Sequence, residues 1–256
     1  MLGSSPGDRT LRSRLLAGEA LAGIFVQTPH PVVPELLGRL GVDFVCIDQE
    51  HSAMGPETVQ ALVGGAALAA TPALVRVADA TAHHVAAALD AGAAGVLVPR
   101  VSSAAAAGDV VRWSRYPPLG ERGLGPGRAA GYGRGIADAL ARANDEVLVA
   151  VQIETRAAMG ALDEILAVDG VDLVFVGPGD LSASLGLEGG LADPRLRDVV
   201  ADLLARARDA GRATGVFALD VRTAAAWRAD GVQLVVLASD LALLAASVER
   251  MWAELA

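Results

Sequence analysis

Short apolar runs alternate with amphipathic or alanine-rich segments along the whole chain. Eight of the runs have strand length and are apolar on both faces, which is typical of strands buried in a parallel sheet. The predicted strands are residues 23–27, 44–48, 73–77, 95–99, 147–153, 173–176, 214–218 and 234–238. The predicted helices between them are residues 33–40, 57–69, 82–91, 103–115, 155–166, 194–210, 221–228 and 241–255.

Strict alternation of strand and helix predicts a parallel sheet with right-handed crossovers. Eight such units in 256 residues match the size of a (β/α)8 barrel, a TIM barrel, formed as a single domain. An open doubly wound sheet is the alternative, but the GxGxxG fingerprint often found after its first strand is absent. Residues 1–17 are expected to be a loosely ordered or helical lead-in. Glycine, which suits a left-handed helix end, follows many predicted helices and supports the count: Gly41, Gly92, Gly170, Gly211 and Gly231.

One connection departs from this pattern. Residues 116–135 are too rich in Gly and Pro for a helix and too long for a plain connector, so we expect a functional loop. The stretch Gly123-Leu-Gly-Pro-Gly-Arg128 superficially looks like a phosphate loop, but it follows no strand and contains a proline. Arg122 and Arg128 in this loop are candidates for binding a substrate carboxylate or a neighbouring subunit.

Composition excludes several classes of function. The chain is 53% hydrophobic and carries 21 basic and 30 acidic residues, with a net charge of −9 and no block of like charge. This balance argues against nucleic acid as a partner. No run reaches the roughly 18 apolar residues of a membrane span, and no signal-peptide apolar region is present, so a cytoplasmic protein is expected. Cys46 is the single cysteine, which excludes an internal disulfide and predicts a small core residue.

In a barrel, polar groups that follow the strands converge on one face. The groups in these positions are Gln27, Asp48, Glu50, His51, Arg76, Arg100, Gln152, Glu154, Asp180 and Asp240. Glu154 and Asp180 are the first pair to consider as ligands of a hard divalent cation. The alternative is that Glu154 opens the next helix as a first-turn acid and Asp180 is a helix N-cap.

His51 directly follows a strand and lies beside carboxylates, so its neutral imidazole is a candidate general base; a surface-loop histidine is the alternative. Arg76 ends an apolar run, where it either stabilises a developing oxyanion or forms a salt bridge with Asp48 or Glu50. No plausible Ser or Cys triad is present, and the absence of lysine excludes a Schiff-base mechanism. The remaining groups suit metal-assisted carbonyl chemistry through an enolate.

Six motifs, in order and at barrel spacing, carry a resemblance to a known family. They are Phe44-Val-Cys-Ile-Asp-Gln-Glu-His51, Val75-Arg76, Gly95-Val-Leu-Val-Pro99, Arg115-Tyr-Pro-Pro-Leu-Gly-Glu-Arg-Gly123, Val151-Gln-Ile-Glu-Thr155 and Val176-Gly-Pro-Gly-Asp-Leu-Ser182. From about Gly18 to Leu255, the chain resembles the metal-dependent (class II) pyruvate aldolases of the 4-hydroxy-2-oxoheptanedioate and 2-dehydro-3-deoxyglucarate type. The resemblance implies a barrel enzyme that reversibly cleaves a 4-hydroxy-2-oxo acid into pyruvate and an aldehyde.

The resemblance also implies roles for individual residues. Glu154 and Asp180 would hold Mg²⁺, Mn²⁺ or Co²⁺, and Gln152 and Gly179 would contact the substrate. His51 would be the proton acceptor and Arg76 the stabiliser of the pyruvate enolate. An acid matched by Asp90 would raise the basicity of the histidine. From the residues alone, Asp90 is a helix-end acid far from the strand ends, and Asp48 is a competing partner for His51.

Several features leave alternatives open. Gly179 and Phe217-Ala-Leu-Asp220 depart from the usual family sequence near the aldehyde end of the expected pocket, so the acceptor aldehyde is open. A citrate-lyase-like acyl-CoA lyase and a non-catalytic metabolite-binding barrel remain alternatives. The last predicted helix carries an apolar stripe that either packs on the barrel or joins subunits, and the resembling family forms hexamers. The stripe consists of Leu241, Leu244, Val248, Met251 and Trp252.

Overall fold

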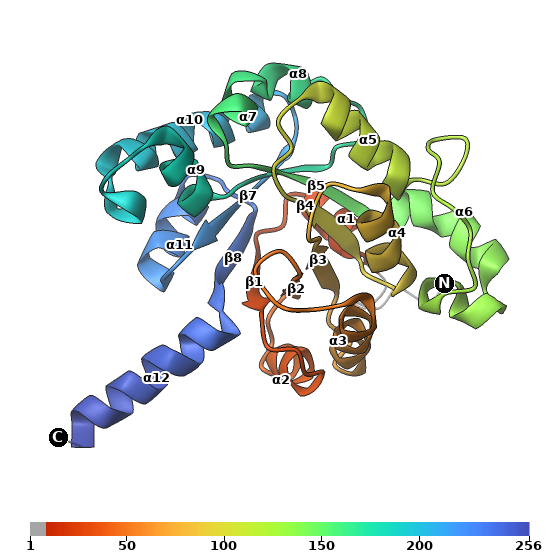
Figure 1. Ribbon diagram of the computed structural model, residues 1–256, viewed down its shortest axis with the longest axis horizontal. Helices are drawn as coiled ribbons and strands as arrows, with labels where there is room; N and C mark the ends of the chain where they lie inside the picture. The colour runs from red at the N-terminus through yellow and green to blue at the C-terminus, as the bar shows by residue number, and fades with distance from the viewer. Residues whose placement is uncertain (1–8, 256) are drawn as a thin grey trace.

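Eight parallel strands close into a barrel in the computed structural model, which describes residues 9–255 (Figure 1). Each strand is hydrogen-bonded to the next one along the chain, and β8 closes the circle against β1. The strands are β1 (Leu21–Val26), β2 (Phe44–Asp48), β3 (Ala73–Arg76), β4 (Gly95–Val98), β5 (Leu148–Ile153), β6 (Leu173–Val176), β7 (Ala213–Ala218) and β8 (Leu234–Ser239). The predicted TIM barrel is therefore confirmed, and the open doubly wound sheet is wrong.

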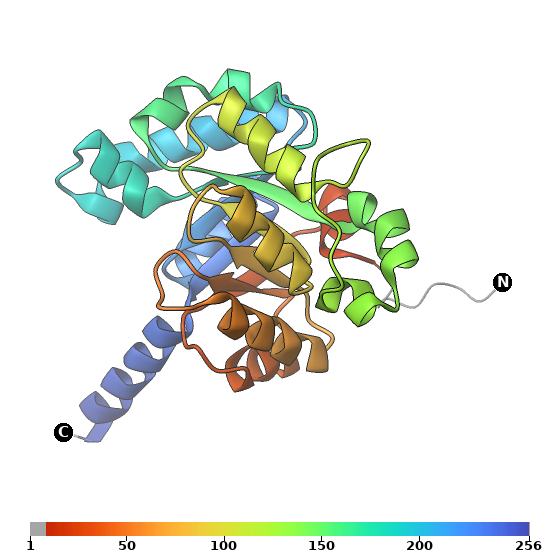
Figure 2. The same ribbon diagram turned by 45° about the vertical axis from the view of Figure 1, so that its right-hand side comes forward.

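Helices surround the barrel (Figures 1 and 2). They are α1 (Leu11–Leu16), α2 (Val32–Arg39), α3 (Pro56–Leu68), α4 (Ala82–Asp90), α5 (Ala104–Ser114), η2 (Arg128–Gly133), α6 (Ile136–Glu146), α7 (Arg156–Gly160), α8 (Leu162–Leu166), α9 (Pro178–Leu185), η3 (Gly190–Ala192), α10 (Pro194–Asp209), α11 (Val221–Ala229) and α12 (Asp240–Leu255). Within residues 9–255, no helix is both long enough and apolar enough to cross a membrane.

Three details differ from the predicted helices. The expected helix over residues 155–166 is two short helices, because the chain leaves helical geometry at Ala161, next to the weak helix former Gly160. The loop of residues 116–135 contains the 3-10 turn η2, although its composition predicted no helix. Helices α6 and α9 lie in stretches with no predicted helix. Helix α1 lies in the expected lead-in, in agreement with the helical form predicted for it, and residues 1–8 of the lead-in lie outside the described chain.

The interior of the barrel is filled by one apolar layer, separate from the layer between strands and helices. Large side chains face small ones, since a Cβ added at Gly23 would lie 2.6 Å from the Phe44 ring. Cys46 is buried in this layer, as predicted. Leu11 and Leu15 of α1 belong to the same buried cluster, so α1 closes the end of the barrel where the strands begin.

Helix α12 extends away from the barrel (Figures 1 and 2) and has no buried residue. Only its beginning is fixed, because the Asp240 carboxylate accepts hydrogen bonds from the backbone N–H groups of Gln27 and Thr28 at 2.9 and 3.0 Å. The apolar stripe of α12 is exposed, with Trp252 67% accessible. The expectation that the stripe packs against the barrel of the same chain is therefore wrong.

Candidate active site

Polar side chains from several strand ends line one cavity of about 210 Å³. Gln27 follows β1, His51 follows β2, Arg76 ends β3, Gln152 lies in β5, and Asp180 lies in the first turn of α9 after β6. Parallel strands end on the same face of a barrel, so residues far apart in sequence meet here. The apolar part of the wall comes from Pro178 and from three aromatic rings, Phe25, Phe175 and Phe217.

A buried ion pair lies at the base of this cavity. Arg76 donates through Nε to Asp48 Oδ1 at 2.9 Å, and its Nη2 lies 2.8 Å from Asp48 Oδ2. Asp48 is fully buried and also accepts a hydrogen bond from Gln27 Nε2 at 2.9 Å. Burial alone would raise the pKa of Asp48, but the hydrogen bonds and charge of Arg76 outweigh it and the pKa is lowered. The Arg76 guanidinium stacks 4.3 Å from the centre of the Phe25 ring, which fixes its orientation.

Glu50 adds a second carboxylate beside Arg76. It is only 7% exposed, and its Oε2 lies 3.3 Å from Arg76 Nη1 without forming a hydrogen bond. Burial raises the pKa of Glu50, and the negative charges of Asp180 and Asp48 raise it further. The sequence placed Glu50 among the polar groups at the strand ends. It gave no sign that Oε2 of Glu50 would be buried without a hydrogen bond, because that depends on tertiary packing.

The His51 imidazole lies at the mouth of the cavity, with 46% of its side chain exposed. Its Nε2 is 3.8 Å from Glu50 Oε2 and 3.9 Å from Asp180 Oδ2. Asp48, the competing partner from the sequence, instead accepts a hydrogen bond from the backbone N–H of His51 at 3.2 Å. The ring therefore reaches both the cavity and solvent, as a group that exchanges protons must.

Glu154 and Asp180 are the two carboxylates that the sequence predicted as ligands of a divalent cation. Glu154 is 1% exposed, its Oε1 accepts from the Arg100 backbone N–H at 2.7 Å, and its Oε2 contacts the Gln152 amide. Arg100 has a φ of +56°, an unfavourable conformation for a residue with a side chain. The pKa of Glu154 is raised by burial and then by the charges of Glu50 and Asp180.

Several carboxylates thus converge with little positive charge to balance them, which fits a hard cation with oxygen ligands. Across residues 9–255, no group of three or more His, Cys, Asp or Glu side chains is arranged to hold a metal. A site at Glu154 and Asp180 would therefore rely on water and substrate oxygens for its remaining ligands, as Mg²⁺-type sites do.

Asp90 lies at the other end of the barrel. It is the last residue of α4, just before β4 begins, and its Oδ1 accepts from Arg122 Nη2 at 2.9 Å. Arg122 is buried and stacks 4.6 Å from the centre of the Tyr116 ring, and Arg128 lies nearby against Gly92. Of the two roles expected for Arg122 and Arg128, binding a substrate in this chain's own cavity is wrong, because the loop covers the opposite end.

Comparison with known proteins places this site in a family. Residues 21–247 match the family described as HpcH/HpaI aldolase/citrate lyase. The chain belongs to this family. It is 39% identical to the hydroxypyruvate/pyruvate aldolase of Roseovarius nubinhibens over 96% of both chains. It is 37% identical to the 2-keto-3-deoxy-L-rhamnonate aldolase of Klebsiella pneumoniae over 92% of this chain and 89% of that one.

A solved structure of an HpcH/HpaI aldolase/citrate lyase family protein from Burkholderia cenocepacia has the same fold, with a TM-score of 0.90 at 34% identity over 96% of this chain and 98% of that one. In this HpcH/HpaI barrel, the wall of the catalytic cavity is open at Gly179. A Cβ added at Gly179 would meet no atom within 4 Å, so the absence of a side chain leaves the cavity open beside Asp180.

The placement of Glu154 predicts different effects for two neighbouring glycine substitutions. A Cβ at Gly177 would lie 2.8 Å from Glu154 Oε2 and 3.0 Å from Gln152 Nε2, whereas one at Gly179 is unobstructed. We expect Gly177→Ala to displace the carboxylate and weaken Mn²⁺ binding by about 10- to 100-fold, the usual effect of disturbing groups around a metal ligand. Gly179→Ala should keep the wild-type affinity. Calorimetric titration with Mn²⁺ measures both, and equal affinities would remove Glu154 as a ligand.

The ion pair predicts a pH-dependent loss of stability in Asp48→Asn. Removing one partner of a buried pair costs about 3–5 kcal/mol. Because the folded pKa of Asp48 is lowered, its stabilisation is complete above the unfolded value of about 3.9 and is lost as the pH falls through the folded value. The difference in the free energy of unfolding between wild type and variant should therefore be largest at pH 7 and should shrink below about pH 4. Urea unfolding across this range tests it, with Glu35→Gln in the exposed Glu35–Arg39 pair as a control expected to change stability by less than about 0.5 kcal/mol.

Proposed function

We propose that this protein is a class II pyruvate aldolase, a carbon–carbon lyase that reversibly cleaves a 4-hydroxy-2-oxo acid into pyruvate and an aldehyde. The observation that carries the proposal is the buried Arg76 guanidinium, which shares one cavity with His51, Gln152 and Asp180. Two relatives that align over nearly the whole chain are named as aldolases, which supports the same chemistry here. The cytoplasmic location expected from the sequence stays a prediction.

Glu154 and Asp180 are the proposed ligands of Mg²⁺, Mn²⁺ or Co²⁺. Such a cation would act as a Lewis acid toward the 2-oxo acid and neutralise the excess negative charge of the carboxylates around it. The two oxygen ligands favour these ions over a closed zinc site, which is built mainly from Cys and His.

The chain's own groups account for the movement of protons and charge. In the cleavage direction, His51 accepts the proton of the C4 hydroxyl. The C3–C4 bond breaks, its electron pair forms the C2–C3 double bond of the enolate, and C4 leaves as the aldehyde carbonyl. Arg76 would stabilise the negative charge that develops on the C2 oxygen, through Nη1, which Glu50 approaches without a hydrogen bond. Gln152 and the backbone at Gly179 contact the carboxylate end of the substrate. The proton held by His51, relayed through water, then moves to C3, which yields pyruvate and restores the neutral imidazole.

The citrate-lyase-like alternative requires a surface for the phosphates of an acyl-CoA. The basic loop of residues 116–135 was the candidate, but Arg122 is buried and paired with Asp90. A non-catalytic metabolite-binding barrel is the other alternative. Pyruvate release from a panel of 4-hydroxy-2-oxo acids, without CoA, separates all three functions.

Arg76 and His51 should differ in pyruvate methyl exchange, which passes through the enolate without a C4 hydroxyl. Arg76→Ala should slow both aldol cleavage and deuterium exchange by about 10²–10³, because a preorganised charge on the oxyanion is lost. Arg76→Lys should recover little, since an ammonium lacks the planar fork. His51→Ala should abolish cleavage yet keep part of the exchange. Proton NMR of pyruvate in D₂O measures the exchange, and excess chelator should stop it in every variant. Wild-type exchange by Arg76→Ala would leave Arg76 a purely structural ion-pair partner.

Asp90 and α12 lead to a proposal about assembly. Asp90 and His51 lie at opposite ends of one barrel, so any contact between them requires a second copy of the chain. The exposed stripe of α12, with Leu244 and Trp252 both over 60% accessible, supplies an apolar surface of the kind that joins subunits. We therefore propose a homo-oligomer, with the hexamer implied by the family resemblance, in which Asp90 of one copy supports His51 of another.

Co-expression of two inactive variants tests this arrangement. His51→Ala and Asp90→Asn, combined in one oligomer, should regain activity, because some sites then join an intact His51 to an intact Asp90. His51→Ala with Arg76→Ala is the matched control and should stay inactive, since both residues line the same chain's cavity. A monomer in light scattering, or no recovery in the first mixture, would contradict the proposal.

A further inference from the structure

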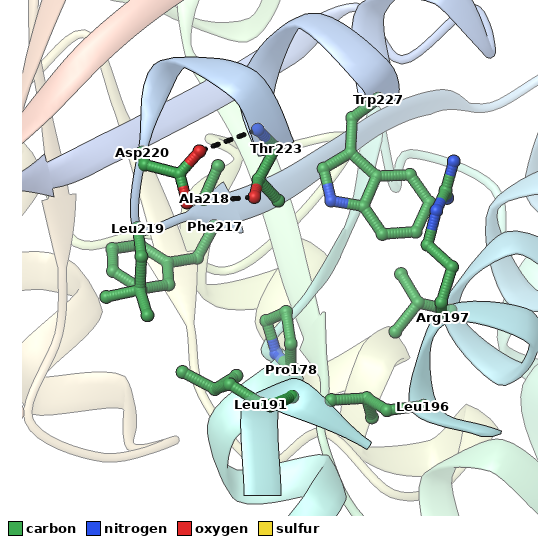
Figure 3. Close-up of a pocket in the computed structure, with 12 residues that line it drawn as sticks. Pro178, Leu191, Leu196, Arg197, Phe217, Ala218, Leu219, Asp220, Thr223 and Trp227 are labelled. Atoms are coloured by element: carbon green, nitrogen blue, oxygen red, sulfur yellow. Dashed lines mark hydrogen bonds between the residues drawn. The ribbon is translucent and has the colours of Figure 1, made fainter. Parts of the chain in front are cut away.

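A second cavity of about 350 Å³ adjoins the catalytic cavity (Figure 3). It lies between α10 and the connection from β7 to α11, and Pro178 and Phe217 line both cavities. Its remaining wall is mainly apolar and includes Leu191, Leu196, Val200, Ala218, Leu219 and Trp227. Figure 3 shows Phe217 and Leu219 across the hollow from Trp227, with Pro178, Leu191 and Leu196 on a third side.

The polar groups at this cavity are already engaged. The Arg197 guanidinium stacks 3.5 Å from the centre of the Trp227 ring and pairs with Asp230. Its Nη1 is buried and has no acceptor, so it is the one buried donor that this residue leaves unpaired at the cavity. Asp220 accepts from the Thr223 backbone N–H at 2.8 Å and from its hydroxyl at 3.1 Å (Figure 3). A charged or polyhydroxylated ligand would therefore lose water here with few partners in return.

We propose that this cavity receives an alkyl or aryl tail on the aldehyde half of the substrate. The inference rests on the proposed function, because it takes the position of C4 from the role of His51. Arg76 and Gln152 engage the pyruvate half, which leaves the substituent on C4 to extend along the shared wall of Pro178 and Phe217. The enzyme thus prefers aldehydes with an apolar chain over semialdehydes that end in a carboxylate and over sugar-like aldehydes.

The open position at Gly179 is consistent with this path. Gly179 and Pro178 are adjacent in the first turn of α9, and a side chain at Gly179 would enter free space in the catalytic cavity rather than protein. The absence of that side chain widens the route from C4 toward the shared wall. Phe217 is partly exposed and lies 5.8 Å from Phe25, centre to centre, so the tail would pass over aromatic faces.

Chain-length dependence of the aldol addition tests the proposal. The substrates are pyruvate and linear aldehydes from ethanal to heptanal, and kcat/KM should rise about fourfold per added methylene until the cavity is full. A semialdehyde of equal length, bearing a terminal carboxylate, should be at least about tenfold poorer than its methyl-ended counterpart. A flat series, or preference for the semialdehyde, overturns the proposal.

Two matched tryptophan substitutions locate the effect. Ala192 is exposed and lines the second cavity, so Ala192→Trp should fill it and flatten the chain-length series. Ala137 on α6 is also exposed but lines neither cavity, so Ala137→Trp should retain the wild-type slope. Circular dichroism confirms that both variants fold. The same slope in Ala192→Trp and wild type would place the tail elsewhere.

A binding measurement separates this proposal from the proposed function. Benzyl alcohol, a non-reactive aryl probe, should show saturation-transfer NMR contact with the wild type and with Ala137→Trp but not with Ala192→Trp. If the protein exchanges the pyruvate methyl protons but shows no chain-length dependence with the aldehydes and no benzyl alcohol binding, only the apolar tail site is overturned. Absence of both exchange and turnover overturns the aldolase function and, with it, the assignment of this cavity to the substrate. A side chain of a second copy seated in the cavity of the assembled protein also overturns it.

Discussion

The buried ion pair of Arg76 and Asp48 determines how the catalytic end of the barrel is built. A guanidinium this deep requires a carboxylate with matching geometry, and Asp48 provides it from the neighbouring strand through two contacts below 3 Å. The same carboxylate accepts from the Gln27 side chain and the His51 backbone. The need to neutralise the buried Arg76 charge with Asp48 therefore sets the positions of residues at the ends of three consecutive strands. It also commits Asp48 to Arg76, which leaves the His51 ring free for a proton.

Beyond that pair, negative charge is in excess. Burial raises the pKa values of Glu50 and Glu154, and the negative charges of neighbouring carboxylates, Asp180 among them, raise both further. Arg76 is already matched by Asp48, and the Arg100 side chain is largely exposed, with its Nε 3.7 Å from Glu50. The excess negative charge destabilises this end of the barrel when no cation is bound. The same excess would favour the binding of a divalent cation with oxygen ligands.

The barrel was predictable because each strand is a local apolar run and each crossover a local helix. The pairing of Arg76 with Asp48 was also among the expectations, since polar groups that end adjacent strands must meet. Helix α6 carries apolar residues at helical spacing, Ile136, Leu140 and Ala143, but it directly follows the Gly- and Pro-rich loop and buries none of its residues, and it was missed. Helix α9 begins inside the Gly177-Pro178-Gly179 turn that ends β6, and turn-forming residues concealed it. The position of Asp90 at a helix end was correct from the residues, whereas the role implied by the resemblance would need a second chain, which the sequence of one chain does not reveal.

Cys46 gives the protein an internal reporter that follows from its position. The only thiol lies inside the barrel, fully buried in the layer below Arg76 and Asp48. Burial raises its pKa far above the usual value, so the reactive thiolate is scarce in the closed state. A thiol reagent can reach it only when strands separate. The labelling rate of Cys46 under native conditions therefore reports how often the barrel opens beneath the catalytic cavity, without an introduced probe and without interference from any second cysteine.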